Sequence, residues 1–193
     1  MKVLQAHLAA HVAPVLQPEE FLRAEWVARV AALDLYVHEL VAQRMVDIFE
    51  GHRPATPAYL KFQVSTETLG RIRTAATVAD ATAAFDLDVR TQLRYVTYQD
   101  PERIAEGVRL CSTVELWNEI AAHLGATVAT KNAAAKALKR DLSLIVERRN
   151  KIAHEGDLQP VLPREPWPIS AVDVAGIATT IDRIVRATDA VVT

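Results

Sequence analysis

Charged and polar side chains crowd the segment from Glu147 to Asp157, and the residues best suited to chemistry are among them. At about 100° per residue, Glu147, Asn150 and His154 lie on one face of a helix. Arg149 instead continues an apolar line, which consists of Leu138, Leu142, Ile145 and Ile152. Arginine is rarely buried without a partner, so Arg149 requires a carboxylate, a phosphate or a subunit boundary nearby.

Two of these side chains are suited to proton transfer and anion binding. Gly156 supplies the left-handed residue that commonly ends a helix, which places His154 in the last turn. The free carbonyls there favour the imidazolium form. With an unperturbed pKa of about 6.5, an imidazole can move protons near neutral pH. A guanidinium can bind a phosphate through two parallel hydrogen bonds, so Arg149 suits the binding of that group.

Residues 149–154, with the sequence Arg-Asn-Lys-Ile-Ala-His, resemble the signature of the HEPN superfamily, in which an arginine and a polar residue precede a histidine. Many members of this superfamily are metal-independent ribonucleases of toxin and defence systems. Residues 148–157 look most like the RiboL-PSP-HEPN branch. Weaker similarity at residues 32–41 and 116–121 extends the resemblance over most of the chain.

The resemblance implies an endoribonuclease that uses neither a metal nor another cofactor. Arg149 and His154 would be the catalytic residues, and Asn150 would orient the histidine or the scissile phosphate. Glu147 and Arg148, which flank the motif, are expected to support this set. In the family, two such motifs often meet across a cleft in a dimer, and a homodimer would also provide Arg149 with a subunit boundary.

The partners that the resemblance implies are RNA, a second copy of the chain and, in toxin systems, an antitoxin or defence-system protein. Some HEPN toxins carry a tyrosine two residues after the histidine, which a nucleotidyltransferase partner modifies. Gly156 occupies that position here. Silencing by that modification is therefore not supported.

RNA cleavage requires few protein groups because the 2′-hydroxyl is itself the nucleophile. One group must move protons, and a cation must stabilise the charge that gathers on the phosphate. The sequence contains no Walker A loop, no G-x-G-x-x-G, no H-E-x-x-H and no cysteine pair. DNA lacks the 2′-hydroxyl, so the same residues should leave it intact. The alternative interpretation is a non-catalytic helical interaction or dimerisation module in which the Arg-His pair is structural.

The charge distribution restricts where RNA could bind. A net charge of −2 excludes a globally basic nucleic-acid binder, so RNA contact requires a local patch. Residues 130–155 contain seven Lys and Arg against three Asp and Glu, a charge of +4 (7 − 3). Within this segment Lys139, Arg140 and Lys151 are the candidate RNA-binding residues. A solvated helix face explains such a charge run equally well.

Residues 18–50 are predicted to form a long central helix, whose apolar side chains sweep about half of its circumference. Asp34 and His38 lie inside this apolar arc, so both need polar partners in the core. They could bond to each other or to neighbouring backbone. Alternatively, one of them reaches Arg149 or His154.

The pattern predicts an all-α, single-domain bundle of six to seven helices over residues 1–193. Four of the nine prolines lie between residues 160 and 168 and predict an extended, proline-rich strap before the last helix. This strap could form one wall of the site. Tyr95 and Tyr98 could stack on bases or pack in the core. The predicted elements are helices at 2–13 and 18–50, a short helix after Ser65, helices at 85–98 and 101–124, the motif helix from Thr130 or Asn132, and a helix after Ser170, with 59–62 left as a loop or short strand.

Cysteine usage and hydropathy indicate the compartment. Cys111 is the only cysteine, so no intrachain disulfide can form and a reducing cytoplasm is expected. No uncharged apolar run approaches the ~20 residues of a membrane span. His7 and His11 lie one helical turn apart, but no third ligand type is near them, so no metal site is expected.

Overall fold

The computed structural model of the chain describes residues 19–192, and the helix expected at residues 2–13, with His7 and His11, lies outside them. Seven α-helices and one 3-10 helix form in the described range, without a β-strand, which confirms the all-α class. The elements are α2 (Glu19–Phe49), η2 (Tyr59–Lys61), α3 (Thr66–Arg73), α4 (Val78–Leu93), α5 (Pro101–Cys111), α6 (Leu116–His123), α7 (Lys131–Glu155) and α8 (Ala171–Val192).

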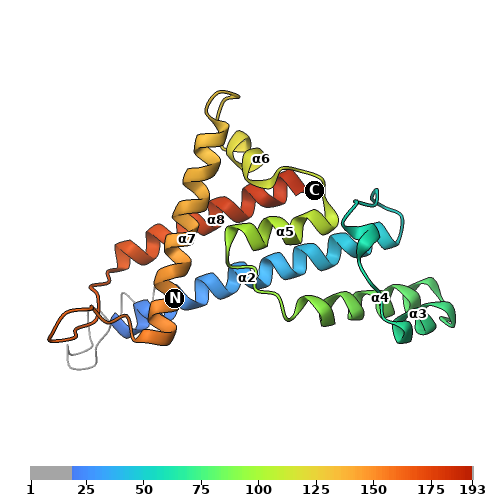
Figure 1. Cartoon of the computed structure of the whole chain (residues 1–193), viewed down its shortest axis with the longest axis horizontal. Coiled ribbons are helices and arrows are strands. Elements are labelled where there is room, and N and C mark those ends of the chain that lie inside the picture. The colour runs from blue at the N-terminus through green and yellow to red at the C-terminus, as the bar shows by residue number, and fades with distance from the viewer. Residues whose placement is uncertain (1–18, 193) are drawn as a thin grey trace.

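Helix α2 is the centre of the fold, as its apolar arc predicts. It runs through the body of the molecule and packs against α4, α5, α7 and α8 (Figure 1). Two glutamates in its first turn face the positive end of the helix dipole. Just beyond its end, Gly51 adopts a left-handed backbone with φ of 79°.

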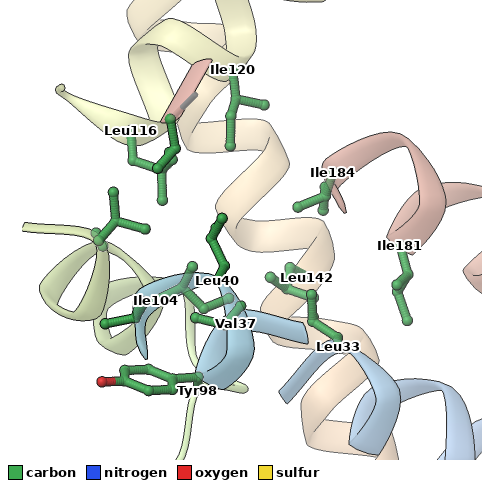
Figure 2. Packing of buried hydrophobic residues seen from close by; sticks show 14 of the residues in the cluster. Leu33, Val37, Leu40, Tyr98, Ile104, Leu116, Ile120, Leu142, Ile181 and Ile184 are labelled. Atoms are coloured by element: carbon green, nitrogen blue, oxygen red, sulfur yellow. The ribbon is translucent and has the colours of Figure 1, made fainter. Parts of the chain in front are cut away.

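The core gathers side chains from helices that are far apart in the sequence. Leu33, Val37 and Leu40 of α2 lie in one cluster with Leu142 of α7 and Ile184 of α8 (Figure 2). All five are buried. Each buried aliphatic side chain stabilises the fold by about 1.5–3 kcal/mol relative to an exposed one, so this cluster fixes how α7 crosses α2.

The helix expected over residues 101–124 is two helices, α5 and α6. Its start is as predicted, since the Asp100 side chain accepts hydrogen bonds from the backbone of the first turn and Pro101 follows it. The helix then breaks at Ser112, whose backbone is extended. A continuous helix would place Trp117 about 24 Å from Pro101. With the break, the Trp117 indole instead donates to the Pro101 carbonyl at 2.9 Å.

Helix α4 and η2 also differ from expectation. Thr77 and Asp80 form a capping box, so α4 begins at Val78, seven residues before the predicted start. It ends at Leu93, which leaves residues 94–100 as a connection to α5. Residues 59–61 form a 3-10 helix rather than a strand.

Helix α7 ends as the sequence predicts. Gly156 is its C-cap, with φ of 68°, and Asp157 follows in the left-handed region at φ of 56°. Residues 158–169, the proline-rich strap, contain only one isolated bridge, between Leu158 and Pro166. After the strap, Ser170 and Asp173 form the predicted capping box of α8.

Candidate functional site

Arg149 lies on the inner side of α7, as the apolar line predicts, but its side chain is only half-buried. Its Nη1 atom donates to the Asn150 side-chain oxygen at 3.0 Å. Its Nε atom is buried and has no hydrogen-bond partner among the described residues. Within residues 19–192 no carboxylate pairs with Arg149, and the ion pairs of α7 involve other cations of the helix. The hydrogen-bond partner that the described residues give this cation is therefore a neutral amide, and none of them supplies the expected carboxylate.

Arg149 and Asn150 face an open pocket of about 680 Å³ between α7 and the connection 94–100. An anion that enters this pocket would meet the guanidinium of Arg149. The other lining residues are Tyr95, Val96, Thr97, Gln99, Asp100, Arg103 and Val146.

His154 is exposed in the last turn of α7 and does not line this pocket. In the described part of the chain it makes no hydrogen bond or ion pair. His154 lies five positions after Arg149, so the two side chains leave the helix about 140° apart. Asn150 lies about 6 Å before His154 along the helix axis and on the same face. One protomer therefore brings Arg149 and Asn150 together, but not His154.

Asp34 and His38 support the connection 94–100 rather than Arg149. A carboxylate oxygen of Asp34 accepts a hydrogen bond from the Tyr98 backbone N–H. The His38 Nε2 atom lies 3.1 Å from the Val96 carbonyl oxygen, which its N–H can donate to. In residues 19–192 neither side chain bonds to Arg149 or His154, so the alternative in which one of them reaches the motif is not supported. His38 Nε2 also lies 4.0 Å from Asp34 Oδ1, so the two side chains contact each other as well as backbone, as the other alternative predicts.

Arg148, expected to support the motif, belongs to a buried ionic cluster. The Asp157 side chain is 1% exposed, and its Oδ2 atom lies 3.2 Å from Arg23 Nε and 3.1 Å from Arg148 Nη2. Arg23 also donates to the Trp167 carbonyl at 2.8 Å, and Arg148 donates to the Pro168 carbonyl at 2.8 Å. The Arg23–Asp157–Arg148 cluster therefore ties α2, the end of α7 and the proline-rich strap together.

The sequence contained a signal for this cluster. Arg23 continues the buried line of Trp26, Val30 and Leu33 on α2, as Arg149 does on α7. An arginine that continues an apolar helix line is the pattern that marks Arg149, and the same pattern marks Arg23. Asp157 had only a weak signal, its position directly after the C-cap glycine.

The three candidate RNA-binding cations are all paired in this structure. Lys139 lies 2.8 Å from Glu102, Arg140 lies 3.3 Å from Asp141, and Lys151 lies 3.0 Å from Glu147. Glu102 belongs to α5, so the count over residues 130–155 omitted its charge. The basic patch is weaker than the sequence alone indicates. Such surface pairs contribute only about 0–1 kcal/mol, so a phosphate can compete for these cations.

No group of three or more His, Cys, Asp or Glu side chains is placed to hold a metal ion in residues 19–192. Among the helices of the same range, none has the length and apolar character needed to cross a membrane.

Comparison of the chain with protein-family models, curated proteins and solved structures finds no match.

Proposed function

We propose that the protein is a metal-independent endoribonuclease in which Arg149 binds the scissile phosphate and His154 transfers a proton. The observation that carries the proposal is the half-buried guanidinium of Arg149, which has no carboxylate partner in residues 19–192 and borders an open pocket beside Asn150. Buried cations are normally paired, so such a group favours an anionic ligand. The motif of residues 149–154 and its resemblance to HEPN ribonucleases suggest RNA as that ligand.

The proposed reaction uses the nucleophile that RNA carries. The 2′-oxygen attacks the adjacent phosphorus and the bond from phosphorus to the 5′-oxygen breaks, which leaves a 2′,3′-cyclic phosphate and a 5′-hydroxyl. A proton leaves the 2′-hydroxyl and a proton reaches the 5′-oxygen. An imidazole is suited to either transfer. The guanidinium stabilises the negative charge that develops on the phosphate oxygens.

A homodimer would complete this site. Arg149 and His154 diverge by about 140° around α7, so one protomer does not direct both at the same phosphate. A twofold arrangement with the ends of the two α7 helices facing each other would place His154 of one protomer near Arg149 of its partner. Light scattering at micromolar concentration should give the mass of a dimer, and a monomer would contradict this arrangement.

The decisive experiment incubates the purified protein with labelled single-stranded RNA, with and without EDTA. We expect cleavage in both conditions and no cleavage of DNA of the same sequence. The variant His154→Ala should lose 10²-fold or more, because a positioned acid or base contributes at least that factor. His123→Ala is the matched control, since His123 is also exposed in the last turn of a helix.

The circular dichroism spectrum of His154→Ala should match that of the wild type, because the His154 side chain makes no hydrogen bond or ion pair in residues 19–192. The nuclease proposal fails if the folded variant cuts at the wild-type rate, or if the wild type cuts no RNA. Arg149→Ala is a less clean test because its guanidinium is half-buried and its removal could alter packing.

The HEPN resemblance suggests a cytoplasmic role as a toxin or defence effector, with an antitoxin or defence-system protein as partner. A second candidate is a non-catalytic dimerisation module. The observation that favours it is the pairing of Lys139, Arg140 and Lys151 with carboxylates. A dimer that binds no RNA would support this second candidate.

A further inference from the structure

The pocket beside Arg149 has an exposed aromatic ring in its lining. Tyr95 is 76% exposed, whereas Tyr98, three residues later, is 2% exposed. The guanidinium of Arg94 lies 4.5 Å from the Tyr95 ring centroid and donates a hydrogen bond to its hydroxyl. At this exposure most of the ring remains accessible. Of the two tyrosines, Tyr98 belongs to the core, and Tyr95 offers a ligand the part of its ring that Arg94 does not cover.

The backbone that carries Tyr95 is held in place from behind. Asp34 and His38 of α2 bond to the backbone at Tyr98 and Val96. The Tyr98 ring also lies against Gly107 of α5, so closely that a Cβ atom at position 107 would be 2.5 Å from the ring. The ring of Tyr95 is therefore presented on a fixed backbone, which lowers the ordering cost of binding a ligand.

The pocket also contains an amide that is open to a ligand. Gln99 lines the pocket, and its side chain makes no hydrogen bond with another residue of the described range. Its amide atoms are not among the fully buried side-chain atoms that lack a partner, so they keep contact with solvent. An amide offers both a donor and an acceptor, which suits the edge of a nucleobase.

The charges around the pocket favour an anion. Arg103 and Arg149 line it together with one acid, Asp100, whose Oδ1 atom already accepts hydrogen bonds from the backbone N–H groups that begin α5. Arg103 pairs with Glu106 at 2.8 Å, and both side chains are more than half exposed. A pair of this kind is weak, so Arg103 can turn to a phosphate.

We propose that this pocket binds one nucleotide of single-stranded RNA. The base stacks on Tyr95 and bonds to Gln99, while the phosphate contacts Arg103 and Arg149. The inference rests on the proposed ribonuclease function, to which it adds a binding subsite and a substrate class. Asn150 also lines the pocket beside Arg149, and in the proposed dimer the phosphate held on Arg149 is the one that His154 of the other protomer approaches. A base must leave its helical stack to enter the pocket, so single strands are preferred over duplexes.

The test measures binding separately from cleavage. A fluorescent 2′-O-methyl oligoribonucleotide has no free 2′-hydroxyl and cannot be cut, so its anisotropy reports binding alone. Tyr95→Ala should weaken binding about 5- to 150-fold, because base stacking on an aromatic ring is worth that factor. Tyr95→Phe keeps the ring and should bind like the wild type.

Arginine variants test the phosphate contact. Arg103→Gln should weaken binding and lower the slope of log affinity against log salt by about 0.7, the value for one phosphate contact on a single strand. Arg71→Gln is the matched control, since Arg71 is also exposed and pairs with a glutamate of its own helix, but lies outside the pocket. It should leave the affinity and the salt slope unchanged.

The subsite is overturned if Tyr95→Ala, folded by circular dichroism, binds the oligonucleotide as tightly as the wild type. It is also overturned if inorganic polyphosphate or an acidic peptide of equal charge displaces the oligonucleotide with the same efficiency as unlabelled RNA. Charge alone would then explain the binding. Tyr95-dependent binding without cleavage would uphold the subsite and reject the nuclease. Cleavage together with binding that is independent of Tyr95 would uphold the nuclease and reject the subsite.

Discussion

Replacing Asp157 with alanine should destabilise the fold, because this carboxylate is the counter-ion between Arg23 and Arg148. The Asp157 side chain is 1% exposed and that of Arg23 is 8% exposed. Removing one partner of a buried ion pair costs about 3–5 kcal/mol, since the other charge stays buried. Arg23 keeps its contacts to Glu20 and to the Trp167 carbonyl. We therefore expect a loss near the lower limit, about 3 kcal/mol.

This loss is large on the scale of a small protein, whose free energy of unfolding is typically about 5–15 kcal/mol. For a chain of this size, 1 kcal/mol corresponds to about 2–4 °C in Tm, so the variant should melt about 6–12 °C lower. Urea unfolding can be followed by tryptophan fluorescence. Two reporters are close to the cluster: Trp26, whose ring lies 5.0 Å from the Arg148 guanidinium carbon, and Trp167 in the strap.

Asp182→Ala is the matched control for this measurement. Asp182 also pairs with an arginine, Arg186, but both side chains are more than half exposed. Its removal should cost less than about 1 kcal/mol. Equal losses for Asp157→Ala and Asp182→Ala would refute the conclusion that Asp157 is a buried counter-ion.

Two further predictions concern α5. Gly107→Ala should lower the free energy of unfolding by about 1–3 kcal/mol in urea titrations, because the new Cβ would meet the Tyr98 ring at 2.5 Å. Gly176→Ala on α8 is the control, because a Cβ atom at position 176 would have no neighbour within 4 Å. This variant should be stabilised by about 0.4–1 kcal/mol, and a loss of stability equal to that of Gly107→Ala would contradict the steric explanation. Burial raises the pKa of the Cys111 thiol to about 12, so iodoacetamide should label it slowly at pH 8 in the folded protein and rapidly in urea. Rapid labelling of the folded protein would show that the thiol is accessible.

The sequence predicts most helix ends because their signals are local. Asp100 with Pro101, Ser170 with Asp173, and Gly156 each act within one turn of the chain, and all three signals mark the observed boundaries. Apolar spacing does not predict the start of α4, because its first two turns are rich in alanine, whereas the capping box of Thr77 and Asp80 marks it.

The candidate site could be predicted only in part, because its partners come from distant segments. The apolar line of α7 indicated that Arg149 faces inward, which the structure bears out. The buried carboxylate, however, pairs with Arg148 and with Arg23, which is 134 residues away from it in sequence. Helical periodicity contains no information about such a contact. Likewise, spacing alone could not decide between Tyr95 and Tyr98, because their burial depends on how the connection 94–100 lies against α2 and α5.

The central position of α2 has a consequence for how the protein is made. Its partners α4, α5, α7 and α8 all follow it in the chain, so a ribosome completes α2 long before the surfaces that cover it. At about 5–20 residues per second, the 134 residues between Arg23 and Asp157 take roughly 7 to 27 s to translate. Throughout that interval Leu33, Val37 and Leu40 lack part of their packing. The nascent chain therefore presents an apolar helix to chaperones until its last helices emerge.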